Sequence, residues 1–138
     1  NGIAGTAGDK YVVGGFASPS KLFVVPRAGG EVHEISLSGD PFAVPQSFQF
    51  AGADGIIFIG AQLYVVNNGG VQEVTFTGPH YDAGTVKNRP VREPGLSTAT
   101  VAHGHLYVVK SEVVKMMHLR QPPDLPFKIY QVPLSTFA

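Results

Sequence analysis

Short apolar runs separated by turn residues dominate the pattern along the chain. The clearest example is the stretch from Asp54 to Asn67, DGIIFIGAQLYVVN, in which two apolar runs flank a Gly-Ala-Gln turn. Runs of this length bounded by turn residues are typical of paired antiparallel strands. We therefore expect a hairpin here.

The second run of this hairpin is repeated. Leu63-Tyr64-Val65-Val66 recurs as Lys10-Tyr11-Val12-Val13 and as Leu106-Tyr107-Val108-Val109. A repeat of this kind indicates stacked copies of one supersecondary unit. The three tyrosines share one repeat position, which predicts that they pack between neighbouring units. Ten positions before them stand, in order, Asn1, Asp54 and Ser97.

Each repeat unit is predicted to be an antiparallel meander of up to four strands. In the first unit the predicted strands are 1–7, 10–15, 21–26 and 31–37. In the second they are 54–59, 62–67, 71–77 and 85–93. Because proline cannot donate to a ladder, Pro90 indicates that the last of these is an outer edge strand.

The third unit departs from the pattern after its first two strands. Its predicted strands are 97–102, 105–111 and 127–134, the first two joined by a His103-Gly104 turn. Between the second and third, residues 112–120 are expected to form one or two irregular helical turns, followed by a Pro-rich extended loop. No fourth strand is expected.

Composition agrees with an all-β fold. The chain has 138 residues, with 17 Gly, 11 Pro and no Trp, which favours many short strands joined by turns. Ten basic residues balance ten acidic ones, so neither nucleic acid nor a membrane surface is expected as a partner. The chain has no Cys, so disulfides and thiol chemistry are excluded.

Four-stranded units with apolar first strands and an edge-like last strand are the blades of a β-propeller. We expect a single domain of about three blades, covering residues 1–45, 46–94 and 95–138, the last without its fourth strand. This is half of a six-bladed ring. Since propellers have roughly four to eight blades, a second copy of the chain or a complementary N-terminal half is expected to complete the ring.

Several short motifs resemble those of a known family. Asn1-Gly2-Ile3, Asp54-Gly55-Ile56 and Leu63-Tyr64-Val65-Val66, with the closing Pro126-Phe127-Lys128-Ile129-Tyr130, resemble the C-terminal half of the six-bladed propellers of the gluconolactonase and senescence marker protein type. The resemblance implies a divalent metal, usually Ca²⁺, in the central channel, with Asn1 and Asp54 as ligands.

The implied chemistry suits these residues. Amide and carboxylate oxygens are hard ligands that fit Ca²⁺ or Mg²⁺, and such a metal would polarise a lactone carbonyl while Asp54 serves as the catalytic base. The family's further acidic ligand comes from a first blade that this chain lacks. The third unit offers Ser97 and Thr98 at the equivalent place, and we expect them, with His103, to contact a substrate.

Each of these residues also has a structural interpretation. Asn and Asp before Gly are common turn formers, and Ser97 has no nucleophile motif around it. His103 and His105 flank Gly104 and are equally consistent with a metal pair or a surface turn.

Three functional hypotheses remain open. The chain is a half propeller that hydrolyses a lactone or small ester once the ring is complete, or it is a non-catalytic propeller that binds a small ligand or a protein. Alternatively, it is a fragment whose partner half holds the rest of the site. The chain begins at Asn1 and carries no signal peptide, which indicates a processed product or a fragment. Low charge and the Gly and Pro content favour a secreted origin.

Overall fold

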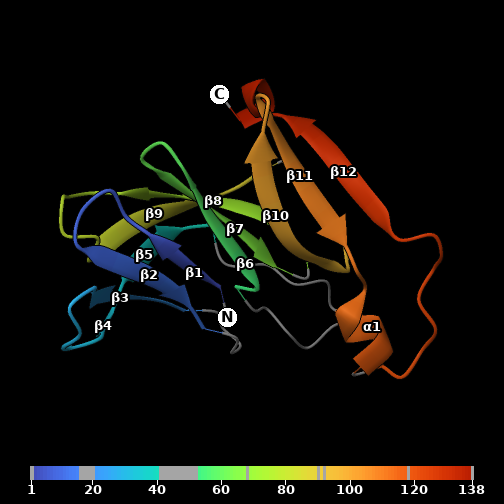
Figure 1. The fold of residues 1–138 in the computed structure, drawn as a ribbon, viewed down its shortest axis with the longest axis horizontal. Helices are drawn as coiled ribbons and strands as arrows, with labels where there is room; N and C mark the ends of the chain where they lie inside the picture. Colours follow the sequence, from blue (N-terminus) through green and yellow to red (C-terminus); the bar gives the residue numbers. More distant parts are fainter. Residues whose placement is uncertain are drawn as a thin grey trace.

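The computed structural model describes residues 2–15, 21–40, 53–67, 69–89, 91, 93–117 and 119–137. It is mostly β-structure in three sheets, and in the described residues none of these sheets closes on itself. The all-β class expected from the sequence is therefore confirmed. Figure 1 shows the sheets in chain order, from β1–β4 through β5–β9 to β10–β12.

The first sheet is a four-stranded antiparallel meander in the order β1-β2-β3-β4. Its strands are β1 (Ile3–Gly5), β2 (Lys10–Gly14), β3 (Leu22–Pro26) and β4 (His33–Glu34). All four lie within the ranges predicted from the alternation and turn signals, although β4 is only two residues long.

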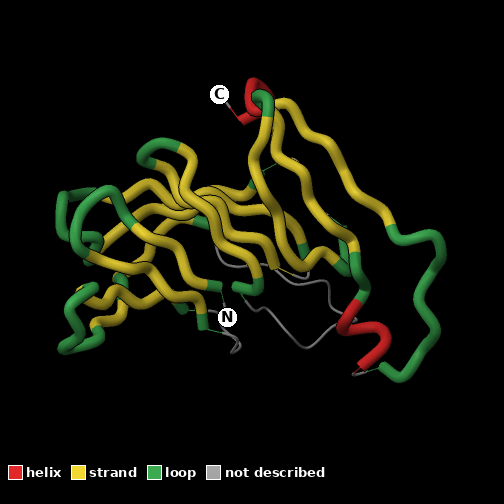
Figure 2. The backbone as a smooth tube through the Cα atoms, viewed as in Figure 1, coloured by secondary structure: helices red, strands yellow, loops and turns green. Residues whose placement is uncertain are grey.

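The second and third sheets repeat the meander. The second has five strands in the order β5-β9-β8-β7-β6. They are β5 (Ser36–Gly39), β6 (Gly55–Ile59), β7 (Gln62–Asn67), β8 (Gly70–Phe76) and β9 (Ala83–Asn88). The third contains β10 (Leu96–Ala102), β11 (His105–Lys110) and β12 (Lys128–Pro133), with helix α1 (Val113–Met117) before β12 and the 3₁₀ helix η1 (Leu134–Phe137) after it. Strands and loops make up nearly the whole trace in Figure 2.

The chain changes sheets at Ile35. The Ile35 amide donates to Leu22 O of the first sheet at 2.8 Å, and the next amide, of Ser36, donates to Asp82 O at 2.9 Å. β5 then pairs in parallel with β9. The predicted outer edge position of the 85–93 strand is therefore wrong, because β5 covers that edge. β9 ends at Asn88, and Pro90 lies outside the described residues.

The three sheets pack face to face. One core cluster joins the first sheet to the second and contains Val12, Leu22, Val24, Leu63, Val65 and Val74. A second cluster joins the second sheet to the third and contains Tyr64, Val66, Val71, Leu106, Val108 and Phe137. The second sheet is thus apolar on both faces, since alternate residues of β7 enter different clusters.

The first strands of the three sheets lie next to one another and begin at the same end of the stack. A methyl group on Gly2 would lie 2.9 Å from Ile56 N, and one on Gly55 would lie 2.6 Å from Thr98 Cα. The close approach of β6 to β10 requires glycine at position 55, because no side chain fits there. The repeat predicted at 1, 54 and 97 therefore has a counterpart in space at residues 2, 55 and 98.

The tyrosines of the repeat do not share one environment. Tyr64 lies in the cluster between the second and third sheets. Tyr11 is next to Val12, which faces the second sheet, so Tyr11 points the other way, where Arg27 lies 5.1 Å from its ring centroid. The prediction that all three tyrosines pack between units is confirmed for Tyr64 and wrong for Tyr11, while Tyr107 faces away from the second sheet.

The cause is the length of one turn. Tyr64 pairs with Ile57 and Tyr107 with Thr100, each three positions after the start of its repeat, whereas Tyr11 pairs with Gly5, four positions after Asn1. The turn of the first hairpin spans three residues between Thr6 and Lys10, one more than the two-residue turns of the other hairpins, and a one-residue slip in pairing sends every side chain of a strand to the opposite face.

Within the described residues, no helix is long and apolar enough to cross a membrane.

Candidate functional site

Asp54 lies directly before β6, at the end of the stack where the first strands begin. Its amide donates to Val66 O at 3.0 Å, which fixes the backbone at the end of the β6–β7 ladder. The side chain is half-buried. Burial raises the pKa of the Asp54 carboxyl above its ordinary value, because removal from water disfavours the charged form. A carboxylate in this state has the raised proton affinity that a general base needs.

Ser97 and Thr98 lie in the neighbouring strand at the same end. The pairing of β10 with β11 shifts between Leu96 and Thr98, which places Ser97 at an irregularity of the ladder. Such bulges redirect a side chain out of the regular alternation. Ser97 Oγ accepts a hydrogen bond of 2.9 Å from the Ser111 hydroxyl, while Thr98 lies against Gly55.

The structure does not bring His103 to this group. His103 forms the β10–β11 turn, with a φ of 48°, and its carbonyl oxygen lies 2.9 Å from His105 Nδ1. Because a strand rises about 3.3 Å per residue, His103 lies roughly 16 Å along β10 from Thr98. In Figure 1 the turn is at the upper end of the third sheet, opposite α1. A small substrate bound at Asp54 would therefore not also contact His103.

The Ca²⁺ site expected at Asp54 stays a prediction. Asn1, the other expected ligand, lies outside the described residues. Within them, no group of three or more His, Cys, Asp or Glu side chains is arranged to hold a metal ion. Ca²⁺ takes six to eight oxygen ligands, and the start of β6 supplies one carboxylate.

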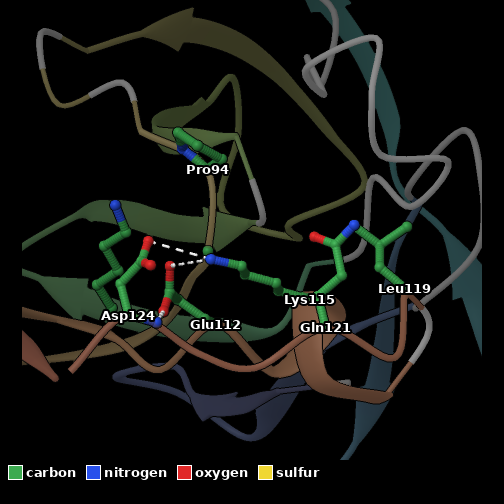
Figure 3. Close-up of a pocket in the computed structure, with 8 residues that line it drawn as sticks. Pro94, Glu112, Lys115, Leu119, Gln121 and Asp124 are labelled. Atoms are coloured by element: carbon green, nitrogen blue, oxygen red, sulfur yellow. Dashed lines mark hydrogen bonds and ion pairs between the residues drawn. The ribbon is translucent and has the colours of Figure 1, made fainter.

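A cavity of about 200 Å³ lies beside the start of β10. Figure 3 shows its charged side chains converging from α1, the end of β11 and the loop before β12. Its lining consists of Pro94, Gly95, Lys110, Glu112, Lys115, Leu119, Gln121 and Asp124. Since Glu112 follows Ser111, the Ser97–Ser111 hydrogen bond connects the cavity wall to the start of β10.

Lys115 is the central charge of the cavity. Its Nζ lies 3.1 Å from Asp124 Oδ2 and 4.0 Å from Glu112 Oε1. Glu112 Oε2 also accepts a hydrogen bond of 2.6 Å from the Asp124 amide. The hydrogen bond from Lys115 holds the pKa of the Asp124 carboxyl below its ordinary value.

The two carboxylates that contact Lys115 differ in their exposure to solvent. Glu112 is buried, and its backbone has a φ of 54°, a conformation that a non-glycine residue rarely adopts. It is held by Gly95 O, which accepts its amide hydrogen at 3.1 Å. Asp124 is attached to an exposed loop, and its side chain is 81% exposed. Lys115 therefore pairs with one buried carboxylate, that of Glu112, and with one exposed carboxylate, that of Asp124.

A second pair borders the cavity. Lys110 Nζ lies 3.6 Å from Glu93 Oε1, and a hydrogen bond with Glu93 raises the pKa of the Tyr130 hydroxyl to about 12. The cavity end of the third sheet thus combines two ammonium groups, three carboxylates and a phenol.

Sequence reasoning missed this cavity. Glu112 and Lys115 are separated by one helical turn, but Lys110, Gly95 and Asp124 come from three other segments. No spacing rule links such residues, because the Pro-rich loop of 121–127 has to fold back before Asp124 reaches Lys115. The only signal in the sequence was the irregular helical segment predicted at 112–120.

In comparisons with known proteins, no family model, no curated protein and no solved structure matched this chain. The resemblance to the gluconolactonase type therefore stays a hypothesis.

Proposed function

We propose that this chain forms three consecutive blades of a β-propeller and binds a small carboxylate at the end of the blades where their first strands begin. The observation that carries the proposal is the cavity around Lys115, located at the start of β10. The face-to-face packing of the sheets and the adjacent first strands support the propeller arrangement. Ligand sites with a few converging polar groups are typical of such concave places.

The charges favour an anionic ligand. Glu112 is committed to the Asp124 amide, whereas the exposed Asp124 carboxylate rests on Lys115 as a free carboxylate would. A small hydroxy acid would replace Asp124 on the Lys115 ammonium and donate its hydroxyls to Glu112. The cavity of about 200 Å³ is smaller than the usual drug-sized pocket of about 300–1,000 Å³, which favours a small ligand.

Binding of D-gluconate, measured by isothermal titration calorimetry, tests the proposal. Lys115→Met should weaken binding about tenfold or more, because a hydrogen bond to a charged group contributes about 1.5–3 kcal/mol. Asp124→Asn should tighten binding, since the competing internal carboxylate is removed. Lys21→Met is the matched control, because Lys21 pairs with Glu34 on the first sheet. Equal binding by wild type and Lys115→Met would refute the site, as would no binding by any small hydroxy acid tried.

A second candidate is hydrolysis of a lactone or small ester, with Asp54 as the base. The raised pKa of this half-buried carboxyl favours it. Hydrolysis of a lactone would give a hydroxy acid, the class proposed for the cavity, whereas a small ester would give a carboxylic acid and an alcohol. The divalent cation implied by the family resemblance needs further ligands from Asn1 or from another chain, since the described residues supply only Asp54.

Turnover of D-glucono-lactone in a pH-stat, with Ca²⁺ and with chelator, tests this candidate. Asp54→Asn should abolish turnover while gluconate binding to Lys115 persists. Turnover that survives Asp54→Asn, or no turnover under either condition, excludes a hydrolase that depends on Asp54.

A further inference from the structure

Among the described residues, the first sheet has an apolar face that no other sheet covers. Ala4, Val12 and Val24 point to the second sheet, so the alternate residues of the same strands point away from it. Ile3 on this face is 63% exposed, and the others are only half-buried. The apolar members of this face are Ile3, Tyr11, Val13, Phe23 and Val25.

The third sheet has a similar face at the other end of the stack. Leu106 and Val108 point to the second sheet, so Tyr107 and Val109 point away and are half-buried. Ile129, paired with Val109, is 66% exposed. Thr100 and Gln131 complete this face.

The two faces correspond to opposite sides of the repeated sheet. Ile3 follows Gly2 as Ile56 follows Gly55, and Ile56 packs toward the preceding sheet. Tyr107 and Val109 correspond to Tyr64 and Val66, which are 6% and 0% exposed because the following sheet covers them. The first sheet therefore exposes the face that packs backward along the stack, and the third exposes the face that packs forward.

We propose that a second copy of this chain occupies both faces. The forward face of one copy packs on the backward face of its partner, as the second sheet packs on the first within one chain. Two such contacts related by a twofold axis close a ring of six sheets, within the range of known propellers. A copy of the same chain is the occupant because it carries both kinds of face.

Charged groups at the backward face have partners within the chain. The Arg27 guanidinium, which lies over the Tyr11 ring, donates to Thr6 O at 2.8 Å. The chain has no net charge, and Lys21 and Glu34 at the border of the backward face neutralise each other at 3.3 Å. Each contact joins unlike faces, and the twofold axis makes the two contacts together one isologous interface; head-to-tail contacts that did not close would give open chains.

Light scattering after size exclusion tests the proposal directly. Wild type should have twice the 14.6 kDa mass of one chain. Ile3→Asp and Ile129→Asp should each be monomeric, because each places a charge in both contacts of the ring. Phe23→Glu is a second variant of the backward face, and circular dichroism verifies that each variant is folded. Val32→Asp is the matched control, since Val32 is 58% exposed but precedes β4 in a loop.

Mixing the two monomeric variants tests which faces meet. In a mixture of Ile3→Asp with Ile129→Asp, one of the two contacts joins an unaltered forward face to an unaltered backward face. Dimers should therefore reappear. A dimer in which like faces meet would not be rescued in this way and would overturn the proposal.

A monomeric wild type at high micromolar concentration would also overturn it, as would a broad distribution of larger assemblies, which indicates an open chain of contacts. The proposal rests on the blade arrangement but not on the ligand. Lys115→Met should leave the mass unchanged, so failure of the cavity and failure of the dimer are distinguishable.

Discussion

The same four residues occur in β7 and β11 with different results. In the second sheet, Leu63, Tyr64, Val65 and Val66 are all buried. In the third sheet, Leu106 and Val108 are buried, whereas Tyr107 and Val109 are half-exposed. The difference is one neighbouring sheet, because β7 is covered on both faces and β11 on one.

The tetrad therefore encodes a strand with two apolar faces, and the tertiary structure decides which of these faces another sheet covers. Its continuous apolar run is typical of a strand buried on both sides. In β7 that expectation is met within the chain. In β11 no sheet of the described residues covers the outer face, which is the physical basis of the proposed dimer.

The largest expected effect concerns charges buried beside Tyr64. Arg89 Nε lies 3.3 Å from Glu73 Oε2, with both side chains mostly buried, although neither atom is aligned for a hydrogen bond. Arg89 also lies 5.2 Å from the Phe137 ring centroid. Arg89→Ala should lower the free energy of unfolding by about 3–5 kcal/mol, because Glu73 would remain buried and unpaired.

Urea unfolding followed by circular dichroism measures this loss. The control is Lys21→Ala, which breaks an exposed pair and should cost under about 1 kcal/mol. Equal losses in the two variants would show that the Glu73–Arg89 pair is in contact with solvent.

The next effect tests the contact of β6 with β10. Gly55→Ala would place a methyl group 2.6 Å from Thr98 Cα, and the two sheets would have to separate. We expect a loss of about 1–3 kcal/mol. Gly78→Ala is the control, since nothing lies within 4 Å of the added carbon. If both variants unfold at the same urea concentration, the second and third sheets do not pack as described.

The tetrad itself can be compared directly. Val66→Ala should cost about 2 kcal/mol, since two buried methyl groups are lost, whereas Val109→Ala should cost under about 1 kcal/mol. Both are measured in the monomeric Ile3→Asp background, so that association does not contribute and the neighbours of Val109 are unchanged. In wild type, Val109→Ala should instead weaken the dimer. A cost for Val109 that matches that for Val66 would indicate that the outer face of β11 is already covered.

The smallest effect is a pH dependence at the border of the third sheet. The Tyr130 pKa is raised to about 12 by its hydrogen bond with Glu93, against an ordinary value of about 10. The raised pKa means that the stabilisation from this bond is complete below about pH 10 and is lost as the pH rises through 12. Glu93→Gln should return the Tyr130 pKa toward 10 in an ultraviolet titration. An unchanged titration curve would exclude the bond.

Much of the fold was predictable because its determinants are local. The hairpins at Gly60-Ala61 and His103-Gly104 follow from apolar runs around short turns, and the helical turn at 113–117 from the break in that alternation. The internal position of β9 was not predictable, since β5 comes to pair with β9 only after the chain leaves the first sheet.

The candidate site was likewise predictable only in part. The repeat correctly indicated that the segments at 54 and 97–98 lie together, since equivalent strands begin at one end of the stack. It could not reveal Lys115 with Asp124 and Glu112, because their contact depends on how the Pro-rich loop folds back.

The sequence by itself determined the strands, their pairing within each meander and their apolar faces, because alternation and turn chemistry act over a few residues. Only the tertiary structure decided which face each strand presents and to which sheet. One extra residue in the first turn reverses the faces of β2, and the order of stacking decides which copy of the tetrad is buried. These outcomes depend on contacts between distant segments, where burial of apolar area outweighs local preference.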